Sequence, residues 1–294
     1  MNYFSAIQIG ICAYESLEKN RSGEVVGITS KGVFLKLADQ SILFLSQEKF
    51  GNPLTINLQP VLQTPSLNVG ESFKIANGLI QFEHSPVVIQ TQSAAIWSSK
   101  RLANPLIFHP DPKDAIALLL SMRSLLAQPV LMLDEVLTLS GLFPEFHPSD
   151  TEIQSMLHGL KNNGLSSPAE CFAPIQFFAG RGRGLTPSGD DLLLGWIYTL
   201  GCWKEKPELD FPQLQQVLRQ AVENRTTAIS RNLIEAAMQG EIDQRLLQAF
   251  EMMVGVRPMD FSKIQNVLEW GSSSGIEVCA GMGLGLLTLS NLPG

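Results

Sequence analysis

The sequence has few of the residues that mark metal-binding, disulfide-linked or membrane-spanning proteins. Its 294 residues include only four cysteines, with no Cys-x-x-Cys pair, so neither a zinc site nor a disulfide framework is indicated. Its four histidines are equally scattered, and none has the His-x-x-x-His spacing of helical metal ligands. No stretch approaches the ~20 apolar residues that a membrane-spanning helix needs. The cysteines are therefore interpreted as buried thiols of a reducing compartment.

Basic residues are also in short supply. Lys and Arg number 21 against 28 Asp and Glu, which gives a formal net charge of -7. A nucleic-acid-binding protein would carry a basic surface, so nucleic acid is not an expected partner. The N-terminal residues Met1–Phe4 lack the basic segment of a secretory signal. We therefore expect a cytoplasmic protein that binds neither nucleic acid nor a membrane.

Apolar residues are abundant, at 45% of the total, which is enough for one large domain or two ordinary ones. The first ~100 residues consist of short β-rich runs separated by turn residues, a pattern typical of a meander. Such a meander protects its edges by closing into a barrel or by packing as a sandwich, and the sequence does not choose between them. Chain breakers between Ala103 and Pro112 mark a boundary. We predict an α+β protein with a β-rich domain at 1–103 and a larger, mainly helical domain at 104–294.

Beyond this boundary the spacing of apolar residues becomes helical. The expected helices are Lys113–Leu126, Leu131–Leu139, Asp150–Leu160, Ser188–Trp203, Phe211–Met238 (one long helix or two), Glu241–Val254, Asp260–Trp270 and Ser273–Leu289. The last of them contains Gly275, Gly281, Gly283 and Gly285. These glycines fit either a helix packed very close to a neighbour or a glycine-rich loop followed by a shorter helix.

The most informative stretch is Gly180–Asp191, whose sequence is GRGRGLTPSGDD. Its alternating glycines allow positive φ and a close approach of the backbone to a ligand. Arg181 and Arg183 can form bidentate bonds to phosphate or carboxylate. Thr186 or Ser188 can cap a helix whose N-terminus offers N–H groups and a favourable dipole to an anion. The stretch therefore predicts an anion site at a helix start.

A structural interpretation stays open for part of this stretch. Ser188 followed by Asp191 has the spacing of a capping box, with Asp in place of the usual Glu or Gln. Capping explains these two residues, but it explains neither the Gly-Arg repeat nor Asp190. Asp190 is also a candidate ligand for Mg²⁺, because hard cations prefer carboxylates. The sequence does not decide whether a metal is bound.

Two further segments carry hydroxyl side chains. Thr226 and Ser230 share a face of the expected Phe211–Met238 helix, where hydroxyls either bond back to a carbonyl or line a pocket. Arg225-Thr226-Thr227 bears a faint likeness to the Ser-Thr-Arg-Thr phosphate loop of ordinary transcarbamoylases. That loop opens a helix, whereas this segment lies inside a helical pattern, so the likeness is set aside. Gly271–Gly275 precedes the last helix and is either a serine cap or a second anion-binding helix start.

The three segments together resemble a bacterial family whose named member is the H subunit of oxamate carbamoyltransferase, from anaerobic allantoin breakdown, a part of purine catabolism. Gly184–Asp191 resembles the family's signature, Arg225–Leu233 its Thr-Thr-x-Ile-Ser helix, and Gly271–Gly275 its Gly-His-Ser/Thr-Ser-Gly turn. Gly51–Ile56 is a looser match. The resemblance covers most of the chain, and its specific part lies between residues 180 and 285.

The chain departs from this family at two positions. Arg183 stands where the family usually has a small residue or proline, and Ser272 stands where it has histidine. If that histidine transfers a proton in relatives, this chain lacks the group. The activity of the named member also belongs to a multi-subunit enzyme, so the resemblance alone does not locate the chemistry in this subunit.

The resemblance implies a carbamoyltransferase subunit, and it implies a site where the three segments meet. The substrate-binding residues expected there are Arg181, Gly182, Arg183, Gly184, Thr186, Ser188, Gly189, Thr226, Thr227, Ser230, Ser273, Ser274 and Gly275; the catalytic ones are Asp190 and Asp191. They would bind carbamoyl phosphate or an oxamate- or oxalurate-type carboxylate, with Mg²⁺ as the one cofactor to consider. The alternative is a non-catalytic subunit that binds an anion or assembles with other subunits.

Overall fold

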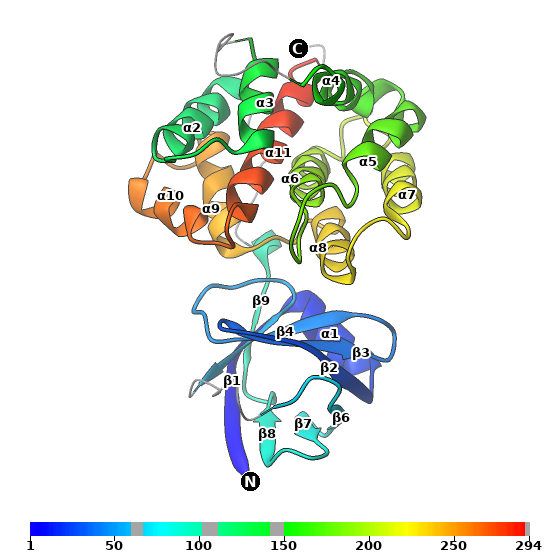
Figure 1. Ribbon diagram of the computed structural model, residues 1–294, viewed down its shortest axis with the longest axis vertical. Helices are drawn as coiled ribbons and strands as arrows, with labels where there is room; N and C mark the ends of the chain where they lie inside the picture. Colours follow the sequence, from blue (N-terminus) through cyan, green and yellow to red (C-terminus); the bar gives the residue numbers. More distant parts are fainter. Residues whose placement is uncertain (60–66, 102–110, 142–149, 292–294) are drawn as a thin grey trace. The chain divides into compact units, whose positions relative to one another are not determined.

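The computed structural model describes residues 1–59, 67–101, 111–141 and 150–291, and it confirms the α+β class. The chain divides into two compact units (Figure 1). The β unit comprises Met1–Leu102 with Ile242–Gln244, and the helical unit comprises Ala103–Glu241 with Arg245–Gly294. The chain breakers at 103–110 lie outside the described residues. Within the described ranges, no helix has the length and apolar character that crossing a membrane requires.

The described part of the β unit contains nine strands in one sheet. They are β1 (Asn2–Gly10), β2 (Ser22–Thr29), β3 (Gly32–Leu37), β4 (Ile42–Ser46), β5 (Thr55–Gln59), β6 (Ser72–Ala76), β7 (Leu79–Phe82), β8 (Val87–Gln90) and β9 (Ala95–Trp97). Their order is β5-β4-β3-β2-β6-β7-β8-β1-β9, and an additional antiparallel pairing of β5 with β1 closes the sheet on itself. The closure decides for a barrel, the one of the two expected forms that leaves no open edge.

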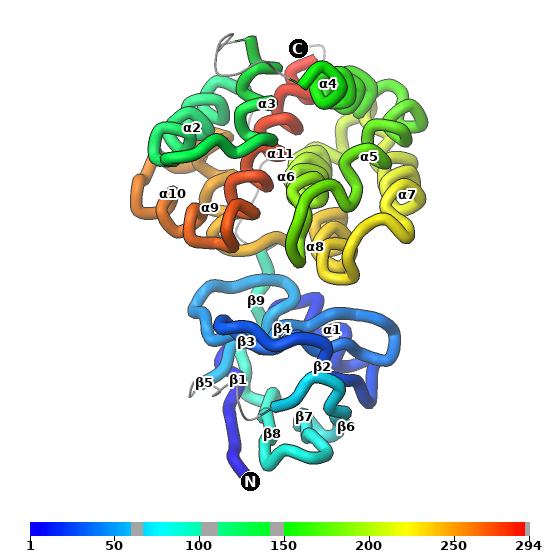
Figure 2. Tube along the Cα trace, in the orientation of Figure 1, coloured from blue at the N-terminus to red at the C-terminus, as the bar shows by residue number. Residues whose placement is uncertain are grey.

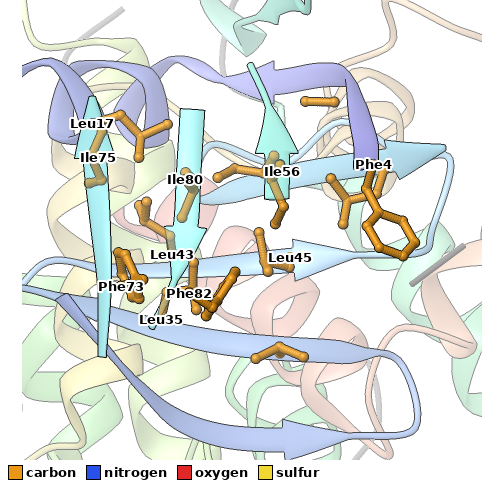
Figure 3. Close-up of a cluster of buried hydrophobic side chains, with 14 of the residues drawn as sticks. Phe4, Leu17, Leu35, Leu43, Leu45, Ile56, Phe73, Ile75, Ile80 and Phe82 are labelled. Carbon is orange, nitrogen blue, oxygen red and sulfur yellow. The ribbon is translucent and has the colours of Figure 1, made fainter. Parts of the chain in front are cut away.

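The long strand β1 makes this closure possible. Its first residues, Asn2–Ser5, pair in parallel with β8, and its residues from Ser5 to Ile9 pair with β5 across a register shift. Side chains of alternate strand residues point inward and form one apolar cluster (Figure 3). The cluster includes Phe4, Leu35, Leu43, Leu45, Ile56, Phe73, Ile75, Ile80 and Phe82, and Leu17 joins it from a helix.

That helix, α1 (Ile11–Lys19), was not expected in a region predicted to contain strands only. It follows β1 without a break. Only Ala13 and Leu17 are buried, so only two positions show the helical spacing of apolar residues. The β unit also includes a distant segment of the chain. Gln244 donates its backbone N–H to the carbonyl of Gly51 at 2.8 Å and accepts the Gly51 N–H at 2.9 Å.

The described part of the helical unit contains ten α-helices. They are α2 (Pro112–Ser124), α3 (Leu131–Leu139), α4 (Thr151–Ser166), α5 (Phe172–Phe178), α6 (Ser188–Cys202), α7 (Phe211–Val222), α8 (Ala228–Met238), α9 (Gln244–Met253), α10 (Phe261–Leu268) and α11 (Ser274–Leu289). The expected 211–238 helix is broken in two, with Asn224 at φ 60° between the parts. Helix α5 was not predicted, because its seven residues span less than two full periods of the apolar pattern.

Helices α6 and α11 form the centre of this unit, and the Cα trace shows them side by side (Figure 2). A Cβ on Gly195 of α6 would lie 2.0 Å from the Val278 carbonyl oxygen, and one on Gly281 of α11 would lie 2.0 Å from the Leu192 oxygen. The glycines of α11 therefore belong to a closely packed helix, not to a loop. Contacts advance together along both helices, from Thr186 with Ser274 to Thr199 with Gly285, so the helices run parallel and their N-termini lie at the same end.

Candidate functional site

Three helices of the helical unit begin at one place, and the three segments of interest are their first residues. The hydroxyls of Thr186, before α6, and Ser274, at the start of α11, are 2.9 Å apart. Thr226, before α8, donates its hydroxyl hydrogen bond to a carboxylate oxygen of Asp190 in the first turn of α6. Thr227 donates to the Leu185 carbonyl at 2.7 Å. Segments up to 88 residues apart in sequence thus meet around the starts of α6, α8 and α11.

The Gly-Arg loop has the left-handed backbone that its glycines allow. Gly180, Gly182 and Gly184 have φ values of 72°, 125° and 99°. A Cβ on Gly180 would also lie only 2.0 Å from the Arg225 carbonyl oxygen, so a larger residue there would push the loop off the α8 start. The loop is tied to α6 by the Gly189 N–H, which donates to the Arg181 carbonyl at 2.8 Å.

The capping-box alternative is wrong. Pro187 occupies the N-cap position of α6, Ser188 is the first helical residue, and no side chain caps the helix. The N–H groups of Asp190 and Asp191 both donate to the Pro187 carbonyl, at 2.9 and 3.1 Å. Both carboxyl groups point into the protein and are 1% exposed. A capping carboxylate would instead lie over the helix end, so the role of Asp191 is not the capping of α6.

Asp190 links the loop to the start of α8. One of its oxygens accepts the Gly180 N–H at 2.7 Å, and the other accepts the Thr226 hydroxyl. Burial raises the pKa of Asp190, and hydrogen bonds from Thr226, Gly180 and Ser230 oppose the rise. Both oxygens are therefore engaged by the protein, which makes Asp190 an organiser of the two segments.

Asp191 and Glu277 form a second, less satisfied pair of acids. Burial raises the pKa of Asp191 well above its ordinary value; hydrogen bonding from Ser274 and Thr186 opposes this, and the charges of Glu277 and Asp190 add to it. Burial likewise raises the pKa of Glu277, against hydrogen bonding from Ser188 and Ser273. One oxygen of each acid, Asp191 Oδ2 and Glu277 Oε2, has no hydrogen-bond partner among the described residues.

Glu277 was not among the predicted site residues, although the sequence contains a signal for it. It is the only charged residue in the sixteen residues of α11, a helix whose other side chains are apolar or small. A lone acid near the start of such a helix is costly to bury without a partner. Its position in the first turn offsets part of this burial cost, because the helix dipole favours a carboxylate there.

Thr226 and Ser230 do not lie in the middle of a helix, as expected, but at the start of α8. Thr227 is the N-cap residue, and its hydroxyl accepts the Ser230 N–H at 3.0 Å. Thr226 precedes the helix and reaches Asp190, while Ser230 is buried within the first turn. The segment Arg225–Thr227 therefore opens a helix, and the reason for setting aside its likeness to a transcarbamoylase phosphate loop does not hold.

The arginines lie toward the surface. Arg181 is half-buried and stacks on Phe177, with its guanidinium carbon 4.2 Å from the ring centroid. Arg183 and Arg225 are exposed. Beside them, the backbone N–H groups of Ser188 and, on α8, of Ala228 and Ile229 have no protein acceptor in the described ranges.

The turn before α11 completes the convergence. Ser273 occupies the N-cap position, as the serine-cap alternative requires, but its side chain makes no cap hydrogen bond. Ser272 is exposed, Ser274 contacts Thr186, and Gly275 is buried with its N–H on the Trp270 carbonyl at 3.2 Å. The letters Gly-x-Ser-x-Gly of this turn match a hydrolase elbow, but that elbow joins a strand to a helix, and this turn joins α10 to α11.

The structure thus brings Thr186, Asp190, Asp191, Thr226, Thr227 and Ser274 into one cluster, with Ser188, Ser230 and Ser273 beside its acids. Gly182, Arg183 and Gly184 form its exposed rim. In the part of the chain that the structure describes, no group of three His, Cys, Asp or Glu side chains is arranged to hold a metal ion.

Comparison with known proteins identifies the segment that holds this cluster. The family model of oxamate carbamoyltransferase subunit AllH matches residues 178–286, which span the Gly-Arg loop, the α8 start and most of α11. No curated protein and no solved structure matches the chain. The match supports the expected family over this segment: residues 178–286 are similar to oxamate carbamoyltransferase subunit AllH.

Proposed function

We propose that the chain is a carbamoyltransferase subunit that binds carbamoyl phosphate, or a carboxylate of the oxamate or oxalurate type, at the start of α6, α8 and α11. The observation that carries the proposal is the convergence of three helix N-termini beside Arg181. A helix N-terminus presents the positive end of its dipole, and three together favour an anion more than one does. The N–H groups of Ser188, Ala228 and Ile229 are the donors with capacity to spare.

In carbamoyl transfer, the bond between the carbamoyl carbon and the phosphate oxygen breaks as the acceptor amide nitrogen bonds to that carbon. Phosphate leaves, and the nitrogen loses a proton. Arg181, Arg183 and the N–H groups would bind the anionic groups and stabilise charge that develops on them. Asp190 or Asp191 would orient the attacking nitrogen through a hydrogen bond.

Calorimetric titration of the full chain with phosphate, carbamoyl phosphate and oxamate tests the anion site. Arg181→Ala should weaken binding by roughly 1.5–3 kcal/mol, the range for hydrogen bonds to charged groups. Arg219→Ala is the matched control, because this exposed arginine of α7 already bonds Glu235. Unchanged affinity in Arg181→Ala, or no binding of any of the three anions to the unaltered chain, would refute the proposal.

A second candidate is a non-catalytic subunit, and one position favours it. Ser272 is exposed beside the cluster and stands where the resembled family has histidine. A serine without a base cannot exchange protons at its ordinary pKa, whereas histidine titrates near neutrality. If relatives use that histidine, Ser272→His should raise carbamoyl transfer to oxamate by about 10²–10⁴-fold. Turnover by the isolated chain that Ser272→His leaves unchanged would argue against a missing proton-transfer group.

A further inference from the structure

Asp191 and Glu277 each keep one carboxyl oxygen that the described residues leave without a hydrogen-bond partner. Asp191 is 1% and Glu277 4% exposed, so both acids are buried. An unpaired buried polar atom costs roughly 1–3 kcal/mol, more when it is charged. Apolar residues of similar volume would avoid this cost. Two such atoms in one cluster have the capacity to bind a group supplied from outside the chain.

The chemistry of the pair restricts what that group can be. Burial raises the pKa of both Asp191 and Glu277, and the charge of Glu277 raises that of Asp191 further, so the two neighbouring acids disfavour being charged together and favour sharing one proton. The pair then offers one O–H donor and one carboxylate acceptor. A primary amide or carbamoyl group, –CO–NH₂, has the complementary edge, because its carbonyl accepts and its amino group donates.

We infer that Asp191 and Glu277 are the subsite for the –CO–NH₂ end of the substrate, with the amino group on the unpartnered oxygen of Glu277 and the carbonyl on Asp191. The inference rests on the proposed function, and it adds the chemical group that the site selects. The anionic end of the same molecule would lie on the N–H groups and arginines at the helix starts. Glu277 thereby becomes a specificity-determining residue, and it acts by binding, not by positioning another group.

A ligand reaches the pair from the side of the Gly-Arg loop. The hydroxyls that adjoin Asp191 are those of Thr186 and Ser274, and Thr186 belongs to the segment between Gly180 and Pro187. Gly182 through Leu185 are exposed, and no atom lies within 4 Å of where a Cβ on Gly184 would be. This exposed side of the loop is the proposed approach of the ligand to the acids.

Two small anions test the inference, because they differ only in the group at issue. Oxamate carries –NH₂ where pyruvate carries –CH₃, and the carboxylate is the same. The full chain should bind oxamate at least about 10-fold more tightly than pyruvate, as expected for a hydrogen bond to a charged acceptor. N,N-dimethyloxamate, which cannot donate, should bind no better than pyruvate. Carbamoyl phosphate against acetyl phosphate repeats the comparison with a phosphate as the anionic group.

The matched variants are Glu277→Met and Glu152→Met. Glu277→Met removes the acceptor and keeps an unbranched side chain, and it should reduce the preference for oxamate over pyruvate to about twofold or less. Glu152→Met changes an exposed glutamate in the first turn of α4 and should leave the preference unchanged. If Glu277→Met does not fold, the dimethyl derivative on the unaltered chain decides the question.

The outcomes separate this inference from the function on which it rests. Equal binding of oxamate, dimethyloxamate and pyruvate would overturn the amide subsite and leave the anion site intact. A preference that survives in Glu277→Met would overturn it as well. Absence of binding for oxamate, pyruvate and phosphate alike would remove the proposed function itself, and the amide subsite with it.

Discussion

The packing of α6 against α11 allows a quantitative prediction, because two glycines of one helix differ sharply in what surrounds them. A Cβ on Gly281 would lie 2.0 Å from the carbonyl oxygen of Leu192 and 3.0 Å from the backbone nitrogen of Trp196. A Cβ on Gly283 would meet only the end of the Leu119 side chain, at 2.7 Å, with the next atom at 3.8 Å. Backbone atoms cannot turn aside, whereas a leucine methyl can.

Gly281→Ala therefore forces the two helices apart by more than 1 Å before ordinary contact distances of at least 3.4 Å return. Overpacking of this kind costs about 1–3 kcal/mol, and here it acts on backbone at the centre of the unit. The better helix propensity of alanine returns at most about 1 kcal/mol. We expect a net loss near 2 kcal/mol, which lowers the melting temperature of the helical unit by roughly 4–8 °C. Gly283→Ala should change it by no more than about 2 °C in either direction.

The same substitution should affect the site, because the helix spacing sets the separation of Asp191 on α6 from Glu277 on α11. Melting is followed by circular dichroism at 222 nm, and oxamate binding is measured on the same samples by calorimetry. Gly281→Ala should weaken binding together with stability, and Gly283→Ala should leave both nearly unchanged. Equal melting temperatures for the two variants would refute the close-packing argument.

Two further predictions concern the acids of α6. Asp190→Asn should lower stability by roughly 1–3 kcal/mol, because an amide has one acceptor oxygen for the two donors, Gly180 N–H and Thr226 hydroxyl, that Asp190 now satisfies; an unchanged urea midpoint would contradict this. Asp191→Asn should become more stable relative to the unaltered chain as pH rises. The reason is that a carboxyl group with a raised pKa in the folded state binds more protons folded than unfolded. The unaltered chain therefore loses stability as pH rises above the ordinary pKa of 3.8, at about 1.4 kcal/mol per pH unit. Melting at pH 4.5 and pH 8 measures the difference, and a difference that shrinks or reverses toward pH 8 would show that Asp191 is ionised.

Much of the fold could be predicted because its signals are local. The alternation of apolar residues predicted strands in the first hundred residues, and their period predicted most of the helices. Helices α1 and α5 were missed because they are short, with nine and seven residues, and α1 buries only two of them. The closure of the barrel could not be predicted, because it depends on β1 pairing with β5, about fifty residues away, and no local pattern specifies that partner.

At the site, the spacing of residues predicted which side chains take part, but it misled about where two of those side chains point. The glycines predicted positive φ, and Gly180, Gly182 and Gly184 have it. Ser188 and Asp191 have the spacing of a capping box, yet Asp191 turns inward because its surroundings are Ser274 and Glu277, more than eighty residues away. Tertiary contacts of this kind override a local preference worth about 1 kcal/mol.

The arrangement of charges at the three helix starts combines two opposed effects. The dipoles of α6, α8 and α11 favour negative charge at their N-termini, by about 0.3–1 kcal/mol each at exposed positions. Burial of Asp190, Asp191 and Glu277 disfavours the same charge, and burial is the first cause of the raised pKa of each acid. The positive ends of the helices are therefore only partly compensated by the chain's own acids. A bound phosphate or carboxylate would complete that compensation from the solvent side, and its charge would further favour the protonated form of Asp191. Anion binding and the retention of a proton on the inner acid thus support each other, which is the condition that a neutral –CO–NH₂ group requires of its binding partner.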